Sequence, residues 1–205
     1  MSDQTAACDE PSPNYLTTSE VADLGLASAG IDVLISRDAR IYGASRVSIG
    51  NHVRIDAFTI ISAGASVVIG NYVHIAPLCC LSGQGRIIME DFSGLSGRVS
   101  IYTSSDDYSG RTMTNPTVPA EFKGVKSAEI CIERHAIIGS GAVLLPGASI
   151  GEGSAVGALT LVSTRLPEWK VFAGNPLRLV GKRRRDLLDL KRCFLEGVQS
   201  AAPNI

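Results

Sequence analysis

The chain has 205 residues, a length that predicts one domain with a sizeable core and modest appendages. Its 19 Lys and Arg residues against 20 Asp and Glu residues give a formal net charge of -1, which argues against a broad nucleic-acid-binding face. Apolar residues make up 45% of the chain, which excludes wholesale disorder. No apolar run approaches the roughly 18 residues that suggest a membrane span.

The N-terminus and the cysteines indicate a cytoplasmic protein. The first 13 residues lack a basic region followed by an apolar one, so they do not resemble a secretory signal. The cysteines are odd in number and show no C-x-x-C spacing, so we expect free thiols in a reducing compartment and neither disulfides nor a metal site. They are Cys8, Cys79, Cys80, Cys131 and Cys193.

Residues 1–28 are expected to form an N-terminal tail with one short helix near residues 18–24, capped by a Ser or Thr. From residue 29 the sequence becomes periodic, because aliphatic residues recur at successive spacings of 6, 6 and 8. The positions are Ala29, Ile35, Ile41, Ile49, Ile55, Ile61, Ile69, Ile75, Leu81, Met89, Leu95 and Ile101. Each coil of such a repeat holds about 20 residues, and equivalent residues would stack as aliphatic ladders.

The second half of the chain carries the same repeat with a strict period of six. Its aliphatic positions are Ile132, Ile138, Leu144, Ile150, Val156 and Val162. A helix would need apolar positions about 3.6 residues apart, and a plain alternating strand has no period of six. The sequence therefore predicts an all-β solenoid over residues 29–166, in which three short strands form each coil.

Two segments of the chain depart from this period. Residues 102–129 break it completely, and a long irregular loop inside a compact repeat is usually functional or disordered. Residues 167–205 are predicted to form a turn and a short terminal helix over residues 182–196, which could cap the open end of the solenoid.

The hexapeptide run, the phrase Ile138–Gly147 and the ending Ala173–Arg178 resemble the hexapeptide-repeat acyltransferases. Within that family they are most similar to the galactoside and maltose O-acetyltransferase type and to the sugar acetyltransferases of surface-polysaccharide clusters. The resemblance covers roughly residues 29–180. It implies a left-handed parallel β-helix, acetyl-CoA as co-substrate without a metal, and a sugar or sugar-nucleotide acceptor. It also implies a homotrimer whose active sites lie between subunits, each reached by the neighbour's protruding loop.

The resemblance implies that the acetyl-CoA contacts lie in the C-terminal coils, at the positions that match the family's motifs: Ser140, Ala158 and Arg178. Small residues would let the pantetheine arm lie along the coil, and Arg178 could meet a phosphate. The family usually has Thr-Lys where this chain has Ser163-Thr164, so a cationic contact is lost there. Arg165, one place further on, is the candidate to replace it.

The catalytic base is the main departure from the family. Galactoside-type enzymes carry a His in the loop, where this chain has the acidic stretch Ser104–Asp107. His74 is the leading substitute, because it precedes inward-facing Ile75 and an imidazole can take a proton from the acceptor near neutral pH. Asp106 and Asp107 could orient that imidazole or act as the base themselves.

Tyr102 and Asn115 are expected to contact the substrate from the loop. Two other classes of function remain open. A non-catalytic solenoid could serve as a scaffold. A γ-type carbonic anhydrase would use the same solenoid, but it needs three clustered His ligands, and the three histidines of this chain lie at non-equivalent coil positions. O- and N-acetylation also remain open, and an amine acceptor needs less help from a base.

Overall fold

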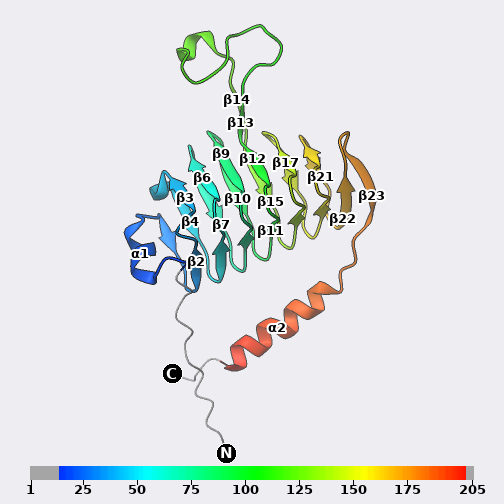
Figure 1. Cartoon of the computed structure of the whole chain (residues 1–205). Coiled ribbons are helices and arrows are strands. Elements are labelled where there is room, and N and C mark those ends of the chain that lie inside the picture. Colours follow the sequence, from blue (N-terminus) through cyan, green and yellow to red (C-terminus); the bar gives the residue numbers. More distant parts are fainter. Residues whose placement is uncertain (1–13, 202–205) are drawn as a thin grey trace, which may run out of the picture.

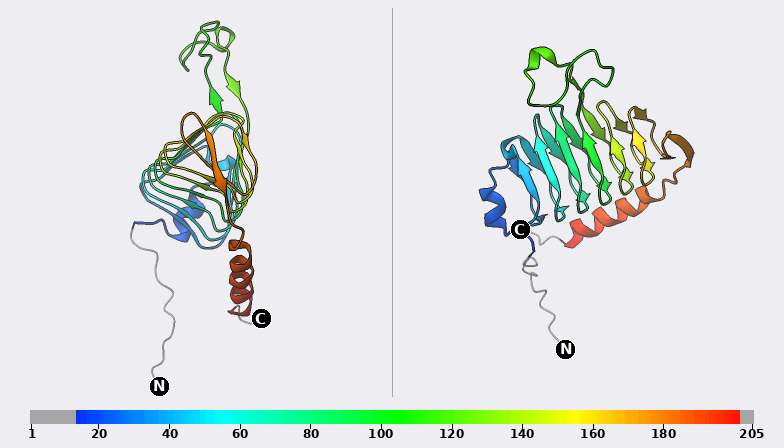
Figure 2. Two further views of the ribbon diagram at one scale, coloured as in Figure 1. Left: turned by 90° about the vertical axis from the view of Figure 1, so that its right-hand side faces the viewer. Right: turned by 45° about the horizontal axis from the view of Figure 1, so that its top comes forward.

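The computed structural model describes residues 14–201 and, among these, the side chains of residues 14–197. They form a parallel β-solenoid in which the chain winds through three sheets (Figures 1 and 2). The first sheet contains β1 (Ser28–Ala29), β4 (Val47–Ile49), β7 (Val67–Ile69), β10 (Ile87–Met89), β15 (Ile130–Ile132), β18 (Ser149–Ile150) and β21 (Arg165–Leu166).

The second sheet lies on the next side of every coil. It contains β2 (Val33–Ile35), β5 (Val53–Ile55), β8 (His74–Ile75), β11 (Gly94–Leu95), β16 (Ile137–Ile138), β19 (Ala155–Val156), β22 (Lys170–Ala173) and β23 (Arg178–Lys182). The third sheet contains β3 (Arg40–Tyr42), β6 (Ile60–Ala63), β9 (Cys80–Gly83), β12 (Ser100–Tyr102), β17 (Val143–Leu144) and β20 (Leu161–Val162).

Strand register confirms the predicted repeat. Ile55 pairs with Ile35 on one side and with Ile75 on the other, so residues 20 apart stack in one inward ladder. These side chains are almost completely buried, and they form the core together with the equivalent ladders of the other two sheets. Each coil buries its apolar row against its neighbours, which is the energetic basis of a solenoid.

The corner between the first and second sheets repeats one backbone feature. One residue near its end has a positive φ in successive coils: 55° at His52, 55° at Tyr72 and 60° at both Phe92 and His135. Because this conformation turns the chain sharply, side chains of successive coils come to lie one above another at the corner.

The segments that do not follow the repeat lie at the surface or the ends of the solenoid. The loop leaves the third sheet through β13 (Ser104–Ser105), which pairs antiparallel with β14 (Lys126–Ser127), and it projects from the body with the short 3-10 helix η2 (Ala120–Phe122) (Figure 1). A second 3-10 helix, η1 (Ala44–Arg46), forms a corner near the N-terminus. Helix α1 (Thr18–Asp23) begins with the expected cap, because Thr17 and Glu20 form a capping box.

The C-terminal segment differs from its prediction in two ways. Residues up to Lys182 belong to β23, which pairs antiparallel with β22 at the end of the solenoid, so helix α2 begins later and spans Leu187–Ala201. The helix also runs alongside the solenoid instead of across its end (Figures 1 and 2). The reason is that Phe194 packs edge-on against Tyr72 and Phe92 at the first corner. No described helix has both the length and the apolar character that membrane crossing requires.

Candidate active site

His74 begins the short strand β8, with its side chain outside the coil because the next residue, Ile75, faces the core. Its Nε2 atom lies 2.8 Å from Oδ2 of Asp56, and 51% of the imidazole remains exposed. The strand pairing places it directly beside Arg54 of β5. His74 is therefore both anchored by a carboxylate and open to a substrate.

Asp56 is the centre of this cluster. Its Oδ1 atom accepts hydrogen bonds from Nε of Arg54 at 2.7 Å and from the hydroxyl of Tyr15 at 2.8 Å, and only 10% of its side chain is exposed. Burial alone would raise the pKa of Asp56, but the hydrogen bonds from His74, Arg54 and Tyr15 outweigh it, so that its pKa is lowered. The ionised carboxylate favours the proton on Nε2 of His74, which leaves Nδ1 with a lone pair for proton transfer.

A recess of about 520 Å³ lies beside this cluster on the outer face of the second sheet. Its floor is formed by Gly94, because this residue places no side chain between His74 and Ile137 in the neighbouring strands. The recess is lined by Tyr72, His74, Ala76, Phe92, Ser93, Gly94, Leu95, Ser96, Gly97, His135, Ala136, Ile137 and Arg183. A substrate group placed here would lie next to the imidazole.

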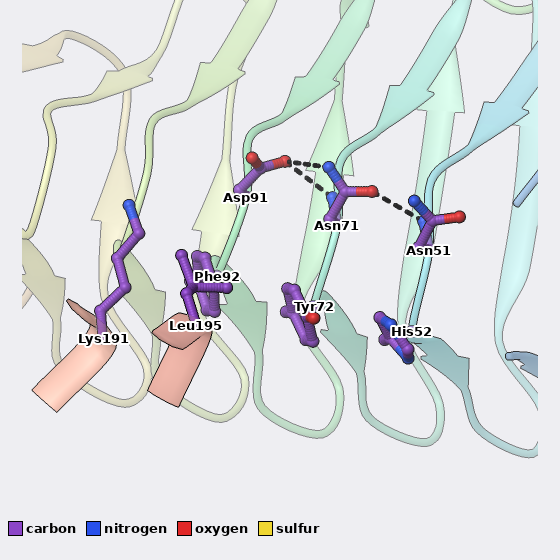
Figure 3. Close-up of a pocket in the computed structure, with 8 residues that line it drawn as sticks. All are labelled: Asn51, His52, Asn71, Tyr72, Asp91, Phe92, Lys191 and Leu195. Atoms are coloured by element: carbon purple, nitrogen blue, oxygen red, sulfur yellow. Dashed lines mark hydrogen bonds between the residues drawn. The ribbon is translucent and has the colours of Figure 1, made fainter. Parts of the chain in front are cut away.

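The other two histidines belong to a stack of rings along the first corner. The ring centroids are 4.6 Å apart for His52 and Tyr72, 4.8 Å for Tyr72 and Phe92, and 5.1 Å for Phe92 and His135, with nearly parallel planes. Above the rings, the polar residues Asn51, Asn71 and Asp91 form a second ladder of hydrogen bonds (Figure 3). Offset stacking of this kind stabilises the corner.

His135 is buried in this stack. Burial, with smaller contributions from Lys191, Arg183 and Arg134, lowers its pKa and favours the neutral ring. Among the described residues, no group of three or more His, Cys, Asp or Glu side chains is arranged to hold a metal ion.

The acidic residues of the loop have other partners in this chain. The carboxylate of Asp107 accepts hydrogen bonds from the backbone amides of Ser109, Arg111 and Thr112, at 2.9, 3.1 and 3.1 Å. Hydrogen bonding, chiefly with Ser109, lowers the pKa of Asp107 to about 2. Asp106 is half-buried beside it, and its carbonyl oxygen accepts from Ser105.

Within one chain the carboxylate that holds His74 is therefore Asp56. The expectation that Asp106 or Asp107 orients the imidazole, or acts as the base itself, stays a prediction. Sequence reasoning missed both Asp56 and Tyr15. The 20-residue period contained part of the signal, because it places Arg54 next to His74 and hence Asp56 close by. Tyr15 carried no such signal, because it precedes the repeat.

The two loop residues expected to touch the substrate lie away from this sheet. Tyr102 ends β12 in the third sheet, with its ring partly exposed. Asn115 lies in the projecting loop, has a φ of 73° and accepts a hydrogen bond from the amide of Thr117 at 3.0 Å. Neither side chain lines the recess beside His74.

The structure brings three of the four residues expected at the acyl donor close together. Ser140 and Ala158 lie in successive coils, at the corner between the second and third sheets. There the amide of Leu159 donates a hydrogen bond to the carbonyl oxygen of Ser140 at 2.9 Å. Arg178 begins β23 and pairs with Ala173 in the adjoining coil.

Arg165 stands apart from these residues. It lies in β21 of the first sheet, and its guanidinium is 3.5 Å from the carboxylate of Glu133. All four candidate donor residues are exposed. Ser140, Ala158 and Arg178 therefore lie along one edge of the solenoid, whereas Arg165 lies on a different side of it.

Comparison with known proteins identifies the relatives of this fold. No family model matches the sequence. The dTDP-4-amino-4,6-dideoxy-D-glucose acyltransferase of Escherichia coli is 39% identical over 181 residues, which are 88% of this chain and 94% of the relative. The crystal structure of AntD, an N-acyltransferase from Bacillus cereus, in complex with dTDP and 3-hydroxybutyryl-CoA superposes with a TM-score of 0.88 at 38% identity, over 91% of this chain and 98% of AntD.

A more distant structure shares the fold alone. The hexapeptide-repeat acetyltransferase VCA0836 of Vibrio cholerae superposes with a TM-score of 0.56 at 20% identity, over 83% of each chain. The expected left-handed β-helix is confirmed by these superpositions. The match to the E. coli enzyme covers nearly the whole length of both chains, and that extent identifies the family. The chain is an acyl-CoA-dependent acyltransferase and belongs to the hexapeptide-repeat acyltransferases that act on sugar nucleotides.

Proposed function

We propose that this enzyme transfers an acyl group from acyl-CoA to the amino group of a nucleotide-linked 4-amino-4,6-dideoxyhexose. The observation that carries the proposal is the 39% identity with the E. coli enzyme named for this acceptor, over almost all of both chains. A variant of AntD solved with dTDP-4-amino-4,6-dideoxyglucose and coenzyme A supports it further, with a TM-score of 0.85 at 37% identity. The acceptor atom is then nitrogen, and the product is an amide.

The reaction needs a neutral amine next to the thioester. The amine lone pair attacks the carbonyl carbon, the new C–N bond forms, and the C–S bond breaks to release coenzyme A. The nitrogen loses one proton during this exchange, and the leaving sulfur gains one. A general base near the amine and a hydrogen-bond donor near the thioester carbonyl oxygen would therefore lower the barrier to acyl transfer.

His74 is the base in this proposal. Its Nδ1 atom accepts the proton from the amine, while Asp56 holds Nε2 and stabilises the imidazolium that forms. Asp106 and Asp107 keep their expected role, as a second partner of the imidazole or as the alternative base, which the projecting loop would carry to the His74 of a neighbouring subunit. Tyr102, at the point where the loop leaves the solenoid, and Asn115, within the loop, would contact the acceptor as well.

Coenzyme A is proposed to lie along the edge marked by Ser140, Ala158 and Arg178. Their exposure supports this placement, because a pantetheine arm needs an open track with small side chains, and phosphates attract a guanidinium. Arg165 would meet the nucleotide end of the donor from the neighbouring edge.

We further propose a homotrimer in the cytoplasm that acts in surface-polysaccharide biosynthesis. In a single chain the recess beside His74 is open on its outer side, and a second subunit would close it. Light scattering on the purified chain tests the trimer: a mass three times that of the chain is expected, and a monomer at working concentration contradicts it.

The proposed reaction is tested by thiol release from acetyl-CoA and longer acyl-CoA donors. The acceptors are dTDP-4-amino-4,6-dideoxyglucose and, as a matched control, the same nucleotide with glucose, which offers only hydroxyls. Mass spectrometry of the product should show one acyl group on the amino sugar. Thiol release with the glucose nucleotide alone would assign O-acylation instead. Absence of turnover and of coenzyme A binding would indicate a scaffold.

A further inference from the structure

Gly94 is a glycine that the solenoid backbone does not require. Corner glycines have no room for a side chain: a Cβ atom at Gly50 would lie 2.7 Å from the backbone of Gly70. A Cβ atom at Gly94 would meet only the carbonyl oxygen of His74, at 3.6 Å, which is ordinary van der Waals contact. Its φ is also not positive. Because glycine weakens a strand interior, its presence here points to a role other than folding.

The missing side chain keeps open the space next to the proposed base. Gly94 pairs with His74 on one side and with Ile137 on the other, so its outward face lies between these two side chains. Across the strand, the recess continues to Ser96 and Gly97 at the next corner. Any side chain at position 94 would project into this recess.

The far end of the recess adjoins the edge proposed for coenzyme A. The amide of Gly141 donates to the carbonyl oxygen of Gly97 at 3.1 Å, and Ser140 is the residue before Gly141. A donor arm that lies along this edge therefore brings its thioester to the end of the recess at Gly97. The acyl group then extends from the thioester into the recess, over Gly94 and toward the imidazole.

We propose that the recess over Gly94 holds the acyl group of the donor and that Gly94 sets the largest acyl group the enzyme accepts. This inference rests on the proposed function. The recess of about 520 Å³ leaves room for an acyl group well beyond acetyl. The nearby side chains of Ala76 and Ile137 provide apolar contacts for an alkyl chain, and Ser96 provides a hydroxyl for a substituted one.

The test compares acetyl-CoA with butyryl-CoA in the full-length wild-type enzyme and in Gly94→Ala and Gly94→Val. One extra or missing methylene in a hydrophobic pocket changes kcat/KM by about 10- to 200-fold. We expect Gly94→Val to lower kcat/KM for butyryl-CoA at least about 10-fold more than for acetyl-CoA, with Gly94→Ala between it and the wild type. Gly181→Ala is the matched control, because Gly181 belongs to the same sheet and a Cβ there meets no atom within 4 Å.

Thermal unfolding separates this role from a structural one. Both variants at Gly94 should melt at or above the wild-type temperature, because the added Cβ has room and the strand loses a glycine. An equal loss for both donors, or a raised KM for the amino sugar nucleotide alone, would assign the recess to the acceptor and overturn the proposal. An unchanged donor ratio would overturn it as well.

Donor binding tests the recess without the acceptor. Calorimetry should show that the wild-type enzyme binds butyryl-CoA more tightly than coenzyme A, and that Gly94→Val removes this difference. The result stands even if the amino sugar nucleotide is not acylated, so failure of the proposed acceptor is distinguishable from failure of this inference. Equal binding of butyryl-CoA and coenzyme A by the wild-type enzyme would refute it.

Discussion

Replacement of Asp56 by Asn tests how the candidate base is held. The carboxylate contacts Nε2 of His74 at 2.8 Å, Nε of Arg54 at 2.7 Å and the hydroxyl of Tyr15 at 2.8 Å. The amide keeps the shape of the side chain but removes its charge. It therefore no longer fixes the proton on Nε2 or stabilises the imidazolium.

Replacement of Asp56 by Asn is expected to lower both activity and stability, by comparable free energies. General base catalysis contributes about 10²- to 10⁴-fold, so we expect kcat to fall about 100-fold in His74→Ala and about 10- to 100-fold in Asp56→Asn. Hydrogen bonds to a charged group contribute about 1.5–3 kcal/mol each when buried. Because His74 and Arg54 are half exposed and solvent screens them, we expect a total loss of only about 1–3 kcal/mol.

The pH dependence gives an independent check. The pKa of Asp56 is lower in the folded protein than its ordinary value of 3.8, so the carboxylate stabilises the fold above about pH 4. That contribution is lost as the pH falls through the folded pKa. The difference in unfolding free energy between wild type and Asp56→Asn should therefore be full at pH 7 and shrink below pH 4.

The measurements are kcat against pH for N-acylation and chemical denaturation at several pH values. The matched control is Arg54→Gln, which removes another partner of the same carboxylate and leaves the contact with His74 in place. It should lower stability with little change in kcat. Wild-type kcat and an unshifted pH profile in Asp56→Asn, alongside an inactive His74→Ala, would refute the role of Asp56.

Three further changes test other parts of the structure. Tyr72→Ala removes the centre of the ring stack and the surface under Phe194, and should lower the unfolding free energy by about 1–3 kcal/mol in urea denaturation; an unchanged midpoint would show that the stack adds nothing. Asp107→Asn removes a carboxylate that remains ionised down to a pH of about 2, and limited proteolysis at neutral pH should cut the loop faster, whereas the melting temperature of the solenoid should stay the same. Arg178→Ala should raise the KM for acyl-CoA about 10-fold at nearly constant kcat, and Arg165→Ala should raise it less; the reverse order would move the donor to the other edge.

The sequence alone predicted the solenoid because its fold depends on a short-range period. Ile55 and Ile75 stack because residues 20 apart occupy the same place in successive coils. The irregular loop and the capped helix α1 were also predicted from local signals, namely a broken period and a Ser or Thr at the start of the helical segment. Motifs of the same periodic region also suggested Ser140, Ala158, Arg165 and Arg178 as acyl-donor contacts, and this assignment stays a prediction.

The tertiary structure alone decided which outward-facing side chains meet. Tyr15 and helix α2 lie outside the repeat, so no period relates their positions to His74 or Tyr72. Their docking depends on the burial and pairing that each surface offers, which a linear pattern does not record. Asp56 became the partner of His74 because the coil that precedes β8 brings a nearly buried carboxylate within hydrogen-bonding distance of the exposed imidazole. Inward positions could therefore be predicted from sequence, whereas the contacts that define the site required the assembled solenoid.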